Sequence, residues 1–523
     1  MKLVFAFLLL FVSSIKINGQ QKQLPLNTFY KEKFIQFSKQ KSLETFFPVN
    51  QRDLDLLKII RDSSLQYSEA SERIFKHHFI ELSKKEGTIG ISPIVHYTKG
   101  KNQLDTTIWP LSRNTRGVFI EGDLLPGFSF NFMFCENQGV FQEFESAYFN
   151  SRGELYPDYQ GYKVQNAVIP GATRTKEFKK NGYDYTYSIG NISFTPLRRW
   201  HIDLGNGQHF IGSGYRSLLL SDNSANAPYL RSKWILSDQW EYQLMARKQL
   251  NLYRKINTLA VESNYESKLM MASYLTYRPI PSVSLSLFTA GNQLRADSLI
   301  KHPFGWSTFV PLPLIQNDLI LPQAHTVNGI TGLNIDIAFP SIRAYGQFVL
   351  DRYDKEWIIA SQLGAYFFNP FGVKNGLIQL EYNYVPRFFY ADPNPKLSYS
   401  HFNLPSAHVK GNNFHELILK LSYEYNRLYL ATRTILYVTK GGDFMQQLGV
   451  NTIFNSPTYK PATASGFTVT EAVELGLRFN KKYNGSIFIE YRGRASDYGK
   501  QKKAYQSLSI GIKTALLNEY FDF

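Results

Sequence analysis

The stretch ELILKLSYEY, residues 416–425, alternates apolar and polar side chains with one exception. Successive residues of a β-strand point to opposite faces, so this strand would have one apolar face and one face that carries charge. The same period of two recurs at residues 128–134, 282–287, 333–339, 473–479 and 507–513. The pattern indicates a β-rich fold from residue 87 onward, but a soluble sandwich would alternate in the same way.

The lengths of the connections favour a membrane barrel. We identify about eighteen candidate strands, which start near residues 87, 114, 127, 183, 199, 229, 240, 267, 282, 327, 341, 356, 376, 414, 428, 470, 485 and 504. Every second connection is short, and the intervening ones are often long, as at 137–182, 293–326, 388–412 and 439–468. Bacterial outer-membrane barrels have an even strand number, short periplasmic turns and long external loops. We therefore predict an antiparallel outer-membrane β-barrel of about 18 strands over residues 87–523, with loops 293–326 and 388–412 at the cell surface.

The first twenty residues have the features of an export signal. Lys2 is followed by an apolar run over residues 3–12 and then by small and polar residues, which is typical of a secretory signal peptide. The run is about ten residues long, and a membrane-spanning helix needs about twenty. We predict that residues 1–20 form a signal peptide and that the mature protein resides in the outer membrane.

Composition and charge narrow the function classes. The chain has 34 Tyr and 40 Phe, and 15% of its residues are aromatic, which suits an exported barrel. The net charge is +16, or +14 once Lys2 and Lys16 of the signal are removed. Export argues against nucleic acid as the partner of this charge, whereas anionic lipid headgroups or acidic glycans fit. Cys135 is the only cysteine, so no internal disulfide can form.

Residues 21–86 differ from the rest. The segments at 51–64 and 71–85 have helical spacing, with Ile74, His78 and Leu82 on one stripe. We predict a small, mostly helical periplasmic region there. The pair His77 and His78 lacks the spacing of metal ligands on a helix, so a surface or packing role is expected. Neither a metal nor a cofactor is predicted.

The segment HFIGSGYRSLLLSDNSANAPYL, residues 209–230, contains glycines that could suggest a nucleotide or catalytic loop. Phe210 stands where a G-x-G-x-x-G motif beginning at Gly205 needs its third glycine, and the chain has no P-loop. Gly212 and Gly214 flank one serine too closely for a G-x-S-x-G elbow. We interpret the glycines as a sharp turn or close packing at the barrel rim.

The segment 205–231, GNGQHFIGSGYRSLLLSDNSANAPYLR, resembles the signature of the Wzi-type capsule-assembly outer-membrane proteins. The retained positions are Gly212, Gly214, Ser217, Leu218, Leu220, Ser221, Asn223, Ala227 and Pro228. The sequence departs from the signature with Ser213 in place of the usual proline and Phe210 near the usual tryptophan. Segments 75–97 and 114–141 resemble the Bacteroidetes branch of this family, which includes gliding-motility proteins of the RemB type. The specific motifs cover about a seventh of the chain.

The resemblance implies an eighteen-stranded barrel with a helical periplasmic part that serves surface-polysaccharide assembly, attachment or gliding. Outer-membrane lipid, surface polysaccharide and other cell-envelope or motility proteins are the expected partners. We predict a rim loop in which Arg216, Ser217 and Asn223 contact the ligand. In the same loop, Gly212, Gly214, Ser221 and Pro228 would shape the turn. Arg216 could bind an acidic sugar, or it could pair with a carboxylate such as Asp222 or one on a neighbouring strand.

The sequence is also compatible with two other functions. An open lumen would make the protein a porin-like channel for small solutes or oligosaccharides. A hydrolase could use Asp351, Asp354 and Glu356, although acids in a short turn are usually only solvated. We expect a non-enzymatic protein. The segment NEYFDF, residues 518–523, resembles the aromatic ending of a last strand that directs barrel insertion, and the alternative is a surface tail.

Overall fold

The computed structural model describes the residues 22–38, 44–49, 77–84, 87–102, 110–125, 127–158, 161–179, 181–254, 265–296, 327–353, 356–440, 465–499 and 501–523. The predicted signal peptide, residues 1–20, lies outside this part of the chain.

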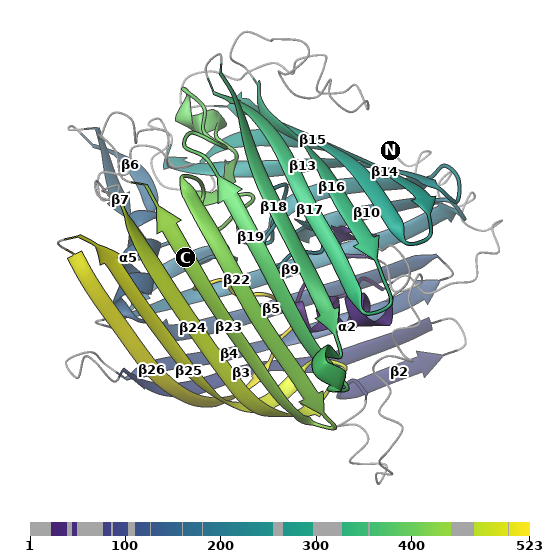
Figure 1. Ribbon diagram of the computed structural model, residues 1–523, viewed down its shortest axis with the longest axis horizontal. Coiled ribbons are helices and arrows are strands. Elements are labelled where there is room, and N and C mark those ends of the chain that lie inside the picture. The colour runs from purple at the N-terminus through teal and green to yellow at the C-terminus, as the bar shows by residue number, and fades with distance from the viewer. Residues whose placement is uncertain are drawn as a thin grey trace.

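Eighteen antiparallel strands of the described chain form a closed barrel (Figure 1). The strands are β3 (Gly87–Asn102), β4 (Leu111–Leu125), β5 (Phe128–Val140), β9 (Gly182–Leu197), β10 (Trp200–Gly207), β12 (Ala227–Ile235), β13 (Trp240–Arg254), β14 (Tyr265–Ile280), β15 (Val283–Ala296), β16 (Val327–Ala338), β17 (Ile342–Tyr353), β18 (Glu356–Phe368), β19 (Gly376–Val385), β22 (Phe414–Tyr425), β23 (Leu428–Thr439), β24 (Gly466–Asn480), β25 (Gly485–Tyr498) and β26 (Gln501–Thr514). Strand β26 pairs with β3 and closes the barrel, with Ser507 opposite Asn102. The predicted barrel is confirmed, and every predicted start lies within four residues of an observed one.

The alternation in the sequence sorts side chains between the two faces of the barrel wall. On β24, Leu475 and Leu477 are 56% and 41% exposed on the outward face, whereas Arg478 faces the lumen and is 8% exposed. The outward face therefore presents the apolar side chains that a bilayer requires, and the inward face presents the polar ones. No helix among the described residues is both long enough and apolar enough to cross a membrane.

Short turns join the strands at one end of the barrel, as between β22 and β23 at 425–428. Several connections at the other end are longer, although β17 and β18 are joined there at 353–356 and β25 and β26 at 498–501. The one from β5 to β9 contains α5 (Glu143–Ser151), β6 (Glu154–Asp158), β7 (Gly161–Gln165) and β8 (Arg174–Phe178). A 3-10 turn, η3 (Pro370–Gly372), lies between β18 and β19.

Four segments fold into the lumen and pack against the inward-facing side chains. The first contains α2 (Thr28–Phe37) and β1 (Phe46–Phe47), and the second is the signature loop 208–226 with β11 (Phe210–Ile211). The third, 386–413, contains η4 (Pro395–Leu397), β20 (Ser400–His401) and β21 (Leu404–Pro405). The fourth is the tail segment 515–523. Strands β1 and β11 pair with each other inside the barrel, and Figure 1 shows α2 enclosed by the wall.

The predicted N-terminal region, residues 21–86, is only partly as expected. Helix α2 lies within it and β3 begins at Gly87. However, α2 is packed inside the barrel, where Tyr30, Phe34 and Ile35 are buried. The helix expected over 71–85 is wrong at its end, because β2 (Ile80–Lys84) pairs with β3. Residues 50–76 lie outside the described part of the chain.

The spacing within 71–85 also suits a strand, and this explains the error. Ile80 and Leu82 are two residues apart and both exposed, so they extend the outward apolar face beside β3. His78 precedes this strand and is buried, with its ring nitrogens 2.9 Å from the Ser92 hydroxyl and 3.0 Å from a Glu121 oxygen. His78 thus has the packing role that the sequence indicated.

Two predictions about external segments need correction. Loop 388–412 is not spread over the cell surface, because Phe389, Tyr390 and Tyr399 are buried in the lumen. Strand β26 ends at Thr514, so Phe523 does not lie on the last barrel strand, and the tail is not at the surface either. These aromatic side chains fill the interior of the barrel. The other predicted surface loop is 293–326, and its residues 297–326 lie outside the described part of the chain.

Candidate functional site inside the barrel

The signature loop connects β10 to β12 and enters the lumen between them, so it does not form the predicted outer rim. Gly212 has φ +110°, and a Cβ there would lie 2.4 Å from Nε2 of Gln347 on β17. Gly214 needs space rather than a positive φ, since its Cβ would lie 2.7 Å from Oε2 of Glu381. Both predicted turn glycines therefore allow the loop backbone to touch the inner wall.

Local hydrogen bonds fix the path of the loop. The hydroxyl of Ser217 donates to the carbonyl of Ile211 at 2.5 Å and accepts the backbone N–H groups of Leu219 and Leu220 at 3.2 and 3.3 Å. The hydroxyl of Ser221 accepts the backbone N–H of Asn223 at 3.2 Å. These are turn-type contacts of hydroxyl groups with nearby backbone.

The structure brings most of the predicted site residues together, but it buries them. Ser217 and Asn223 are 0% and 1% exposed, and the Asn223 amide donates to the carbonyl of Pro405 in the third lumen segment at 3.3 Å. Pro228 lies apart on the exposed side of β12, opposite Asn206 of β10. A surface ligand does not reach Ser217 or Asn223 in this arrangement.

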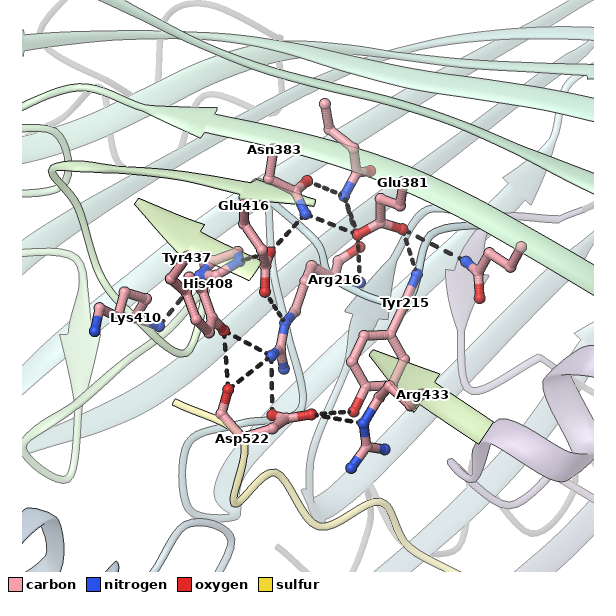
Figure 2. Close-up of polar contacts among 12 residues, drawn as sticks. Tyr215, Arg216, Glu381, Asn383, His408, Lys410, Glu416, Arg433, Tyr437 and Asp522 are labelled. Carbon is pink, nitrogen blue, oxygen red and sulfur yellow. Dashed lines mark hydrogen bonds and ion pairs between the residues drawn. The ribbon is translucent and has the colours of Figure 1, made fainter. Parts of the chain in front are cut away.

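Arg216 is the centre of a buried polar network (Figure 2). Its Nε lies 3.2 Å from Oε1 of Glu416 on β22, and its Nη2 lies 2.9 Å from Oδ1 of Asp522 in the tail segment. Nη2 also donates to the Tyr437 hydroxyl on β23 at 2.8 Å. The Cζ atom of the guanidinium also lies 4.7 Å from the ring centre of Tyr215 and 5.5 Å from that of Tyr520. The sequence predicts that Arg216 either binds an acidic sugar or pairs with a carboxylate of the barrel, and the structure shows the second arrangement. The paired carboxylates are those of Glu416 and Asp522 rather than that of Asp222.

Two wall carboxylates hold lumen segments in place (Figure 2). Glu381 on β19 accepts the backbone N–H groups of Tyr215 and Arg216 at 2.6 and 3.0 Å. Glu416 accepts Nε2–H of His408 at 2.6 Å and the Asn383 amide at 2.7 Å. The His408 tautomer follows from its other nitrogen, which accepts the backbone N–H of Lys410 at 3.1 Å.

Burial and neighbouring charges set the protonation of the lumen segments. Burial raises the pKa of Asp522, but the charges of Arg216 and Arg433 outweigh it and hold the pKa below its usual range. Burial lowers the pKa of His408 despite the adjacent Glu416, so the imidazole is neutral. Burial likewise raises the pKa of Asp222, which accepts the Tyr520 hydroxyl at 2.8 Å.

The residues considered for hydrolysis do not form a site in the described structure. Asp351 is buried on β17, where it accepts the backbone N–H groups of Tyr390 and Arg352 at 2.5 and 2.7 Å. Glu356 is exposed at the start of β18, and Asp354 lies outside the described residues. Within the described chain, no three His, Cys, Asp or Glu side chains are grouped so that they could hold a metal ion. Cys135 is buried in the wall.

Sequence reasoning missed most partners of Arg216. Glu416 is 200 positions from Arg216 in the sequence and Asp522 is 306 positions away, so no local spacing links them. One signal was available, because Glu416 begins the alternating stretch 416–425 and must face the lumen. The sequence predicts that the segment containing Asp522 is a strand end or a surface tail, and neither prediction places Asp522 beside Arg216.

No protein-family model matches the chain, and no curated protein matches it in sequence. Among solved structures, it is similar to Wzi of Escherichia coli, described as an outer membrane protein involved in group 1 capsule assembly and a carbohydrate-binding β-barrel. The TM-score is 0.55 and the identity 10%, over 94% of this chain and 99% of that one. Acinetobacter baumannii OccAB4 has a TM-score of 0.40 and 10% identity, over 83% and 98% of the two chains. Pseudomonas aeruginosa OprD has a TM-score of 0.41 and 10% identity, over 82% and 95%. The likeness to Wzi shows a shared outer-membrane barrel fold.

Proposed function

We propose that the protein is a non-enzymatic outer-membrane barrel that takes part in the assembly or attachment of a surface polysaccharide. The observation that carries this proposal is the packed interior: segments from four parts of the chain fill the lumen and bind its wall. A barrel built in this way offers its outer surface and external loops, rather than a wide pore, for interaction. The fold shared with a carbohydrate-binding barrel supports the same proposal.

Within this proposal, Arg216, Ser217 and Asn223 organise the barrel and do not contact the glycan. Their burial and their contacts with the wall support this role. The motif then acts indirectly, since it holds the lumen segments in the position from which the external loops emerge. The resemblance of 75–97 and 114–141 to the Bacteroidetes branch extends the proposal to gliding motility.

The porin-like alternative would require a lumen wide enough for oligosaccharides. The packing of Leu218, Leu219 and Leu220, all 0% exposed at the centre of the signature loop, argues against such a lumen. Export by the predicted signal peptide and residence in the outer membrane belong to the proposal. Both are tested by N-terminal sequencing of the mature protein and by density separation of the two membranes.

The glycan role is tested with cells that lack the protein and are complemented with variants. We expect the deletion strain to shed surface polysaccharide into the medium, and the wild-type protein to restore retention. The purified full chain should bind an acidic capsular polysaccharide in a pull-down and should not bind neutral dextran. Unchanged retention in the deletion strain, together with no binding by the purified protein, would contradict the proposal.

A further inference from the structure

Two cavities lie along one side of the lumen, between the packed segments and the wall formed by β22–β26 and β3–β5. The first has a volume of about 320 Å³ and extends to Gly100 and Ser507, toward the end of the barrel with long connections. The second has a volume of about 230 Å³ and extends past α2 to Asn375 and Asn484, at the end with short turns.

The two cavities adjoin. Both are lined by Tyr215, Arg433, Glu474, Glu490 and Lys513. Because each cavity reaches toward a different end of the barrel and they share this middle set of residues, they form one path along the wall. The path runs beside the lumen segments and leaves the packed side of the interior untouched.

The side chains of this path differ from buried ion pairs elsewhere in the lumen. Lys513 and Glu474 form a 2.6 Å pair with side-chain exposures of 20% and 16%. Lys33 and Glu424 form a 2.9 Å pair with exposures of 23% and 11%. These four side chains keep part of their surface free of protein contact, so water that enters the cavities can reach the charges. Positively and negatively charged side chains both line the path, so neither small cations nor small anions are excluded by charge alone.

We propose that this path is a narrow passage for water and small inorganic ions that crosses the barrel with the lumen segments in place. The inference is independent of glycan binding, since it concerns the inner wall and not the external surface. The passage is much too small for an oligosaccharide, because its two parts are at or below the lower end of the volumes that hold ordinary small ligands, roughly 300–1,000 Å³.

The passage is tested by conductance of the purified full chain in planar bilayers bathed in potassium chloride. We expect small, steady current steps for the wild type. Ala431→Trp and Ala472→Trp place indole rings in the second cavity and should each reduce the step by at least about half. Val473→Trp is the matched control, since this residue follows Ala472 on β24 but points to the opposite, outward face, where it is 39% exposed.

Selectivity gives a second measurement. Glu490 lines both cavities, so Glu490→Lys should move the reversal potential in a potassium chloride gradient toward that of chloride. Heat-modifiable migration on gels confirms that each variant is a folded barrel before it is measured. Wild-type current no greater than that of a bare bilayer would overturn the proposal. Equal currents in the wild type and both lumen tryptophan variants, with an unchanged reversal potential in Glu490→Lys, would also overturn it.

Discussion

The two sides of the lumen carry similar side chains but use them differently. On the packed side, Glu381 and Arg343 are 1% and 0% exposed, and loop backbone or a neighbouring carboxylate satisfies them. On the solvated side, Arg433 and Arg492 keep side-chain exposures of 28% and 23%, and each pairs with one acid. An inward-facing charge that is covered by a lumen segment holds that segment in place. An inward-facing charge that no segment covers lines the passage instead.

The largest expected effect comes from breaking the buried network at its centre. Arg216→Ala leaves Glu416 and Asp522 buried without their main counter-charge, which should cost about 3–5 kcal/mol of unfolding free energy. Arg433→Ala removes a partly exposed partner of the same Asp522 and should cost about 1 kcal/mol or less. Thermal unfolding and abundance in the membrane measure both. Equal costs would erase the distinction between the two sides.

The outward and inward faces of β24 provide the next test. Leu475→Arg places a charge on the lipid side and should cost about 2–4 kcal/mol if the position is near the bilayer midplane. Arg478→Leu should be milder, because Glu424 retains Lys33 and Lys481 at 2.9 Å each. An insertion assay into lipid vesicles compares them. If both changes were tolerated equally, the assignment of faces would be wrong.

The barrel could be predicted from the sequence because each strand is marked by the alternation of neighbouring residues. An alternating stretch such as 416–425 needs only the identity of nearest neighbours to assign two faces, and the turn spacing then gives the strand number. The lumen segments could not be predicted, because their contacts are distant in sequence. Tyr390 and Leu218, for example, are joined by a 2.7 Å hydrogen bond across 172 positions.

The same difference explains the result for the candidate site. The glycines and serines of 209–230 signal a tight, specific turn, and that part was correct. The glycines and serines alone do not show whether the loop turns outward to solvent or inward to the barrel wall. Glu381, Glu416 and Asp522 decide the direction, and they belong to three other segments.

Gly212 tests the fit of the signature loop to the wall. Gly212→Ala combines a positive φ with a Cβ placed against Gln347, and we expect a loss of about 1–3 kcal/mol. Gly499 has φ +71°, but nothing lies within 4 Å of its Cβ position, so Gly499→Ala carries the backbone strain alone. Chemical unfolding should show Gly212→Ala as the more damaging of the two. The opposite order would place the loop away from the wall.

A smaller effect is expected from pH. The pKa of His408 is lowered in the folded protein, so the unfolded chain takes up a proton first as the pH falls through about 6.5. Stability should therefore fall below that pH. His408→Gln removes this titration and should flatten the dependence of the unfolding temperature between about pH 6.5 and 5. An identical pH profile in the variant would show that His408 is not held neutral in the network.

The central claim is that the signature loop lies inside the barrel and not at its rim. Maleimide labelling tests this directly in a Cys135→Ser background, using Ser217→Cys at the buried hydroxyl position. Asp238→Cys, in an exposed turn with a side chain 98% exposed, is the reactive control. We predict that the folded, heat-modifiable protein labels at position 238 within minutes and at 217 only after denaturation. Rapid labelling of Ser217→Cys in the folded barrel would contradict the account.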